Sequence, residues 1–92
     1  MVHRADIRVI GIVQGVYFRY AAKRKADEFG LSGAVRNMPD GSVHIVCEGD
    51  EKDVARLIEW CKTGPPEARV DRVDAEWMES SSRRYTGFSI TY

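Results

Sequence analysis

Five segments of this chain alternate apolar and polar residues, and two others repeat apolar residues at three- and four-residue intervals. The alternating segments are residues 5–13, 33–38, 42–48, 73–77 and 88–92. A period of two predicts strands with one buried face. The longer spacing predicts helices over 18–29 and from Asp50 through Cys61, each with one apolar stripe. The predicted order is therefore β-α-β-β-α-β with an extra C-terminal strand.

The segments between these patterns carry the expected stop and turn signals. Gly30 can adopt the left-handed conformation that ends a helix, and Gly64-Pro65-Pro66 ends the second one. Pro39-Asp40-Gly41 predicts a tight turn between the second and third strands. The Asp50 carboxylate is placed to cap the second helix. Trp77 alternates with the apolar residues of its strand and is expected to pack in the core.

These patterns favour one fold. Each strand has one apolar face and each helix one apolar stripe, so burial is simplest when both helices cover one face of an antiparallel sheet. The prediction is an α+β, two-layer sandwich of the ferredoxin-like type. The 92 residues make a single domain over 1–92, which buries roughly 60–65% of its unfolded surface. This fold hosts many activities and does not by itself define one.

Charge and composition exclude several kinds of partner. Fourteen basic and fourteen acidic residues cancel, which argues against non-specific binding to nucleic acid or to membranes. The N-terminal residues contain no signal-like apolar run, so a cytoplasmic protein is expected. Cys47 and Cys61 can pair, but in this setting two buried reduced thiols are favoured. Their spacing does not predict a metal site, and no cofactor is expected.

The stretch GIVQGVYFR, residues 11–19, contains a candidate anion site. A predicted strand passes into a helix through Gly15, where the main-chain N–H groups of residues 15–19 can converge on one point. Gly15 lacks a Cβ that would block the approach. Arg19 lies in the first helical turn and its planar guanidinium suits two phosphate oxygens. Taken alone, the stretch favours the simpler interpretation, a tight turn followed by a solvated arginine.

A second candidate is Asn37, which ends a strand although asparagine is a poor strand former. Its side-chain amide needs hydrogen-bond partners, and closing the adjacent turn is the simplest role.

Taken together, the two stretches resemble the signatures of the acylphosphatase family. The first signature is matched at Val9, Gly11, Val13, Gln14, Gly15, Val16, Phe18 and Arg19. The second is met at Gly33, Val35, Arg36, Asn37, Gly41, Val43 and Gly49. Two separated motifs at the right interval are far more specific than either alone. The departure is Ala34, where the family usually has an aromatic residue, and we expect it to alter packing, stability or the range of acyl groups accepted.

The resemblance implies an enzyme that hydrolyses the carboxyl–phosphate anhydride of small acyl phosphates. It assigns Arg19 to phosphate binding and Asn37 to positioning the attacking water, as the two catalytic residues. The expected phosphate-binding loop comprises Gln14, Gly15, Val16, Tyr17, Phe18 and Arg19. The motifs contain no nucleophile, histidine base or acidic metal cluster, which is consistent with catalysis by positioning and charge stabilisation. A monomer without metal or cofactor is expected.

Two alternatives remain open from the sequence. RNA-recognition domains share this sandwich, but they stack bases on exposed aromatic residues of central strands, and SVHIVCEG at 42–49 has none. A non-hydrolytic relative is the other, either a carbamoyl-phosphate-handling module of a larger enzyme or a protein-interaction domain. Hydrolysis of benzoyl phosphate with a chelator present discriminates these readings.

Overall fold

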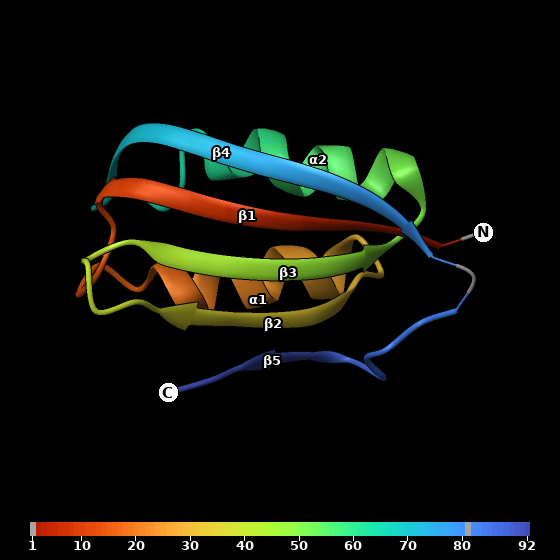
Figure 1. The fold of residues 1–92 in the computed structure, drawn as a ribbon. Helices are drawn as coiled ribbons and strands as arrows, with labels where there is room; N and C mark the ends of the chain where they lie inside the picture. The colour runs from red at the N-terminus through yellow and green to blue at the C-terminus, as the bar shows by residue number, and fades with distance from the viewer. Residues whose placement is uncertain (1, 81) are drawn as a thin grey trace.

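The computed structural model describes residues 2–80 and 82–92. The elements follow the predicted order (Figure 1). They are β1 (Val2–Ile12), α1 (Phe18–Glu28), β2 (Ser32–Asn37), β3 (Val43–Gly49), α2 (Glu51–Cys61), β4 (Arg69–Ser80) and β5 (Phe88–Ile90). The main difference in length is β4, which extends beyond the predicted 73–77 at both ends.

The strands form one sheet in the order β4-β1-β3-β2-β5, and both helices cover the same face (Figure 1). This confirms the predicted ferredoxin-like α+β sandwich. One detail differs, because the sheet is mixed rather than antiparallel. Four strands pair antiparallel, but β5 pairs parallel to β2, with Gly33 opposite Phe88 and Val35 opposite Ile90. The chain crosses from the β4 edge to the opposite edge before β5 begins, and so enters β5 in the direction of β2.

The core lies between the sheet and the helices, where the alternation predicted it. Ala5, Ile7 and Val9 of β1 are fully buried on the helix-covered face. The helices contribute the stripes that their spacing predicts: Phe18, Ala22 and Ala26 from α1, and Val54, Leu57 and Cys61 from α2. Cys47 and Cys61 are both free and buried, as favoured from the sequence. Burial raises the pKa of the Cys47 thiol to about 12, so this thiol stays protonated.

The helix ends agree with the sequence at α1 and differ at α2. Gly30 has φ +70°, and the N–H of Leu31 bonds to the oxygen of Ala26 at 2.9 Å, which closes the last turn of α1. Asp50 occupies the position before α2, but its side chain makes no capping hydrogen bond. The amide of Asp53 bonds instead to the main-chain oxygen of Asp50 at 3.0 Å, so the expected carboxylate cap is wrong.

Trp77 also departs from its predicted place. It lies opposite Ala5 on the helix-covered side of the sheet, but 44% of its surface is exposed. The reason is that β4 is an edge strand, and an edge strand has a neighbour on one side only. Trp60, by contrast, packs against Phe18 with ring centroids 5.3 Å apart.

A buried carboxylate at the end of β3 binds both β1 and the segment before β5. Glu48 is fully buried, and its Oε2 accepts a hydrogen bond from Arg4 Nη2 at 2.8 Å. Its Oε1 accepts the main-chain N–H groups of Arg84 and Tyr85, both at 2.8 Å. These bonds hold the chain where it turns toward β5. Among the described residues, no helix has the length and apolar character needed to cross a membrane.

Candidate active site

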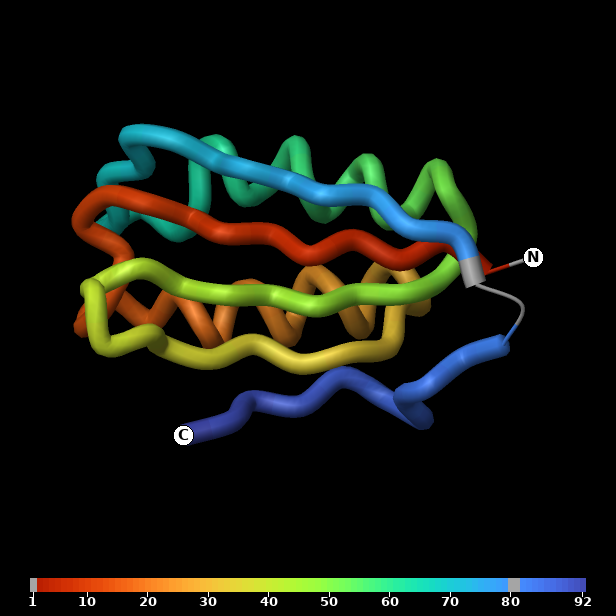
Figure 2. The backbone as a smooth tube through the Cα atoms, viewed as in Figure 1, coloured from red at the N-terminus to blue at the C-terminus, as the bar shows by residue number. Residues whose placement is uncertain are grey.

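Three segments that are distant in sequence meet at one end of the sheet. The loop between β1 and α1, the end of β2 and the residues after β5 all lie at the left end in Figures 1 and 2. They enclose a cavity of about 200 Å³, lined by Val13, Gly15, Tyr17, Phe18, Arg19, Tyr20, Asn37, Ile90 and Tyr92. The structure therefore brings both predicted catalytic residues, Arg19 and Asn37, to one cavity.

The backbone of the loop before α1 has an unusual conformation. Gly15 has φ +75°, and a Cβ built on it would meet no atom within 4 Å, so glycine is needed here for its φ alone. Tyr17 has φ +64° and ψ +23°, and it is the one non-glycine with positive φ among the described residues. The left-handed form costs an L residue about 1–2 kcal/mol. Such strain is characteristic of functional loops, where the surrounding structure maintains it.

The start of α1 offers main-chain N–H groups to this cavity. The first N–H groups of any helix lack intrahelical acceptors, and the Tyr17 side chain makes no capping bond that would replace them. The first turn of α1 contains no acidic residue. The helix dipole adds partial positive charge at this point. The end of α1 at the cavity is thus suited to an anion.

Arg19 is half-buried beside these N–H groups. Its guanidinium carbon lies 4.7 Å from the ring centroid of Tyr92, and its Nη1 donates to the oxygen of Thr91 at 3.3 Å. Among the described residues it forms no ion pair, unlike seven other basic side chains. Its positive charge is therefore available to a ligand.

Asn37 is the last residue of β2 and points to the same side of the sheet as Val35, which is buried. Its main chain pairs with Val43, but its side-chain amide makes no hydrogen bond to another described residue. The turn is closed without it: Asp40 Oδ1 accepts the amide and the hydroxyl of Ser42 at 2.9 and 2.6 Å. The carboxamide of Asn37 is thus free to act in the cavity.

Gln14 has a contact that the sequence did not predict. Its Nε2 donates to the main-chain oxygens of Met38 and Ser42, at 2.8 and 3.0 Å. Both protons of its amide are used, so its side chain holds the β2–β3 hairpin to the loop. Val16 is partly buried and packs against the core.

Ala34 lies on the other face of the sheet. Because neighbouring residues of a strand alternate, Ala34 points away from the side that Asn37 and Val35 share. It lines a separate hollow of about 370 Å³ with Val46 and Tyr85. The absent aromatic side chain would therefore fill this hollow and would not touch the cavity of Arg19 and Asn37.

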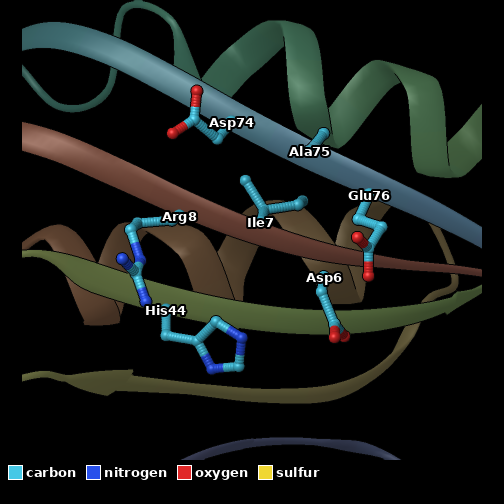
Figure 3. A pocket seen from close by; sticks show the side chains of 7 residues that line it. All are labelled: Asp6, Ile7, Arg8, His44, Asp74, Ala75 and Glu76. Atoms are coloured by element: carbon cyan, nitrogen blue, oxygen red, sulfur yellow. The ribbon is translucent and has the colours of Figure 1, made fainter.

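Another hollow, of about 410 Å³, lies on this same uncovered face (Figure 3). Asp6 and Glu76 pair across the strands there, and their carboxylates point into the same space. Burial lowers the pKa of His44 nearby, an effect that Arg36 and Arg8 reinforce and Asp6 opposes. Two adjacent carboxylates repel an anion, so this hollow is a poor phosphate site. No three His, Cys, Asp or Glu side chains are grouped to hold a metal ion anywhere in residues 2–80 and 82–92.

Four residues that line the cavity were not among the predicted site residues: Val13, Tyr20, Ile90 and Tyr92. The alternation in residues 88–92 predicts that Ile90 and Tyr92 share one face of a strand, but it does not predict that this strand pairs with β2. Taken together, the fold and cavity define a two-layer α+β protein with a candidate anion site built from main-chain amides and one arginine.

Known proteins narrow this class to one family. The family model of acylphosphatases matches residues 5–90. An acylphosphatase of Methylococcus capsulatus is 47% identical over 95% of this chain and 94% of its own length. A crystal structure of an acylphosphatase from Bacillus subtilis superposes with a TM-score of 0.93 at 37% identity, over 100% of both chains. Full-length HypF, solved in a phosphate- and nucleotide-bound form, has a TM-score of 0.84 at 29% identity, but this chain covers 12% of it.

The chain belongs to the acylphosphatase family. The resemblance found in its two motifs is thereby confirmed, and so is the expected class of enzyme.

Proposed function

We propose that the protein hydrolyses the carboxyl–phosphate bond of acyl phosphates by direct attack of a positioned water, with Arg19 and Asn37 as its catalytic residues. One observation carries this proposal. The guanidinium of Arg19, which has no ion pair among the described residues, shares one cavity with the N–H groups at the start of α1 and the carboxamide of Asn37. Family membership supports the reaction class.

Binding comes first. The N–H groups of residues 15–19 and the guanidinium of Arg19 hold the phosphoryl oxygens, and the positive end of α1 favours their charge. Gly15 and Tyr17 give the loop the left-handed turns that aim these N–H groups inward. Gln14 has its side chain on the hairpin, so we assign its part in the loop to positioning.

The chemistry then needs little from the protein. Asn37 orients a water in line with the bond to the acyl oxygen, and this oxygen leaves as a carboxylate, a weak base. A phosphate oxygen of the substrate accepts the water's proton, and the products are a carboxylate and inorganic phosphate. Arg19 and the N–H groups stabilise the equatorial oxygens in the transition state, the dominant contribution in phosphoryl transfer. No step requires a metal ion.

The remaining properties are proposed in the same sense. We assign small acyl phosphates as substrates, a monomer as the working state, the cytoplasm as location, and no nucleic-acid partner, in keeping with the balanced charge of the chain. The non-hydrolytic alternative has one specific support, the fold shared with a segment of HypF.

Hydrolysis of benzoyl phosphate in the presence of a chelator tests the proposal. We expect rapid turnover by the unmodified protein. Asn37→Ala should lower kcat at least about 100-fold and leave KM within about twofold, since Asn37 contacts the water. Arg19→Gln should lower kcat and also weaken inhibition by inorganic phosphate. Arg8→Gln, on the uncovered sheet face, is the matched control for the lost charge.

Absence of turnover in the unmodified protein would favour the non-hydrolytic alternative. Normal turnover of Asn37→Ala would remove Asn37 from the mechanism.

A further inference from the structure

A groove of about 740 Å³ adjoins the cavity that Arg19 and Asn37 line, which we call the phosphate cavity. It lies between α1 and the turn that follows α2, and Trp60, Pro65 and Pro66 form part of its walls. Tyr17 and Tyr20 line both the groove and the cavity. The two tyrosines therefore form the boundary between the two spaces, and a molecule seated in the cavity can extend past them into the groove.

The walls of the groove present aromatic surface to solvent. Tyr17 is 77% exposed and Tyr20 57% exposed, although both are large side chains. Pro66 is also exposed, and Trp60 is partly buried against Phe18. Adjacent exposed aromatic groups that flank a cavity are typical of a ligand site. The phosphate cavity, at about 200 Å³, is small for more than a phosphoryl group and its first bonded atoms.

The charge of the groove is set by one side chain. Four charged residues line it, and three of them are paired: Asp27 with Lys23 at 2.9 Å, and Lys25 with Glu28 at 3.7 Å. Arg24 has no ion pair among the described residues, and its guanidinium carbon lies 5.9 Å from the ring centroid of Tyr20. Arg24 is thus the free positive charge of the groove.

We propose that this groove is the subsite for the acyl part of the substrate, and that it favours aromatic or extended acyl groups ending in a second carboxylate, which Arg24 binds. This inference rests on the proposed function. Arg24 follows Tyr20 by one helical turn, about 6 Å along the axis. That distance matches one aromatic ring with a para substituent. The ring would lie on Tyr20, the phosphoryl group in the cavity and the carboxylate against Arg24.

Two substrates of equal ring size test the inference: benzoyl phosphate and 4-carboxybenzoyl phosphate. The readout is the ratio of their kcat/KM values, because a general loss of activity or stability cancels in it. We expect the carboxylated substrate to be preferred, and Arg24→Gln to lower the ratio about three- to tenfold, as for a partly exposed ion pair. Arg8→Gln is the matched control: it removes the same side chain and charge from the uncovered sheet face, away from the groove, and the ratio should keep its original value.

The outcomes separate the two proposals. If the unmodified protein hydrolyses acetyl phosphate but Arg24→Gln leaves the ratio unchanged, the subsite is wrong and the proposed function stands. An equal fall in Arg8→Gln would show a general charge effect and would also overturn the subsite. If no acyl phosphate is hydrolysed, the proposed function itself fails.

Discussion

The side-chain nitrogen of Gln14 donates a hydrogen bond to the main-chain oxygen of Met38, over a distance of 2.8 Å and across 24 residues of sequence. Gln14 begins the proposed phosphate-binding loop, and Met38 directly follows Asn37. This bond and the second one, to Ser42, fix the distance between the loop that we propose holds the phosphate and the carboxamide that we propose orients the water.

Replacing Gln14 by alanine should therefore lower turnover more than binding. Without the two hydrogen bonds the hairpin moves relative to the loop, and Asn37 loses its alignment. We expect kcat to fall about tenfold, while the inhibition constant of inorganic phosphate changes less than about twofold. Stability should fall by about 1–2 kcal/mol, because two carbonyl groups lose their donor. Steady-state kinetics and urea unfolding measure these quantities. Equal losses in kcat and phosphate affinity would contradict the positioning role.

The left-handed conformation of Tyr17 predicts a stabilising substitution. Glycine adopts φ +64° without steric cost, whereas tyrosine pays about 1–2 kcal/mol. Part of this gain is lost to the greater freedom of glycine in the unfolded chain. We expect Tyr17→Gly to raise the free energy of unfolding by about 0.5–1 kcal/mol, as determined by urea unfolding. Tyr20→Gly, inside α1 with ordinary helical dihedrals, should destabilise instead. A loss of stability in Tyr17→Gly would show that the ring contributes more than the strain costs.

The hollow beside Ala34 predicts a change in stability without a change in catalysis. In Ala34→Trp the indole would fill the space against Val46 and Tyr85. Burying roughly 40 Å² of additional apolar surface stabilises by about 1 kcal/mol. Because this side chain points away from Asn37, kcat and KM for benzoyl phosphate should stay within about twofold. Thermal unfolding and kinetics on the same sample decide the matter. An altered preference among acyl phosphates would reinstate the expectation that residue 34 borders the acyl group.

The buried Glu48 predicts sensitivity to acid. Burial raises the pKa of its carboxyl, but hydrogen bonds from Arg4 and the amides of Tyr85 and Arg84 outweigh this, so the pKa is below its usual value. Because the pKa of Glu48 is lower in the folded chain than in the unfolded chain, where it is about 4.3, the ionised carboxylate stabilises the folded state above about pH 4.3. This stabilisation is lost as the pH falls through the pKa of the folded state.

Glu48→Gln should consequently cost about 3 kcal/mol at pH 7, where Arg4 is left buried without its partner. The difference from the unmodified protein should shrink below about pH 4.3. Urea unfolding between pH 2.5 and 7 follows both effects. A difference that stays constant over this range would mean that the carboxylate charge contributes nothing.

Much of the fold could be predicted because burial is periodic. The alternation of Ala5, Ile7 and Val9 and the stripe of α1 each define a buried face without reference to the rest of the chain. The parallel pairing of β5 could not be predicted, since the sequence of a three-residue strand does not indicate which strand it pairs with. The burial of Glu48 could not be predicted either, because the four groups that donate hydrogen bonds to its carboxylate come from three distant segments.

The site divides in the same way. Arg19 and Asn37 could be predicted to share one site by recognising two motifs together. Each motif alone predicted only a turn or the end of a strand. Gln14 was predicted as part of the loop, but its bond to the hairpin depends on how close the loop and turn pack. The groove beside Tyr20 lies between α1 and the turn at residues 64–66, and no pattern within either segment predicts it.

The contact between Arg19 and the residues after β5 has a practical consequence for work with this protein. Tyr92 stacks on the guanidinium, so an affinity tag or fusion partner attached after it would emerge beside the cavity that Arg19 and Asn37 line and would compete with a ligand for that space. Val2 begins β1, whose 11 residues separate it from the cavity by roughly 35 Å of extended chain. Tags, dyes and surface linkages are better placed at that end.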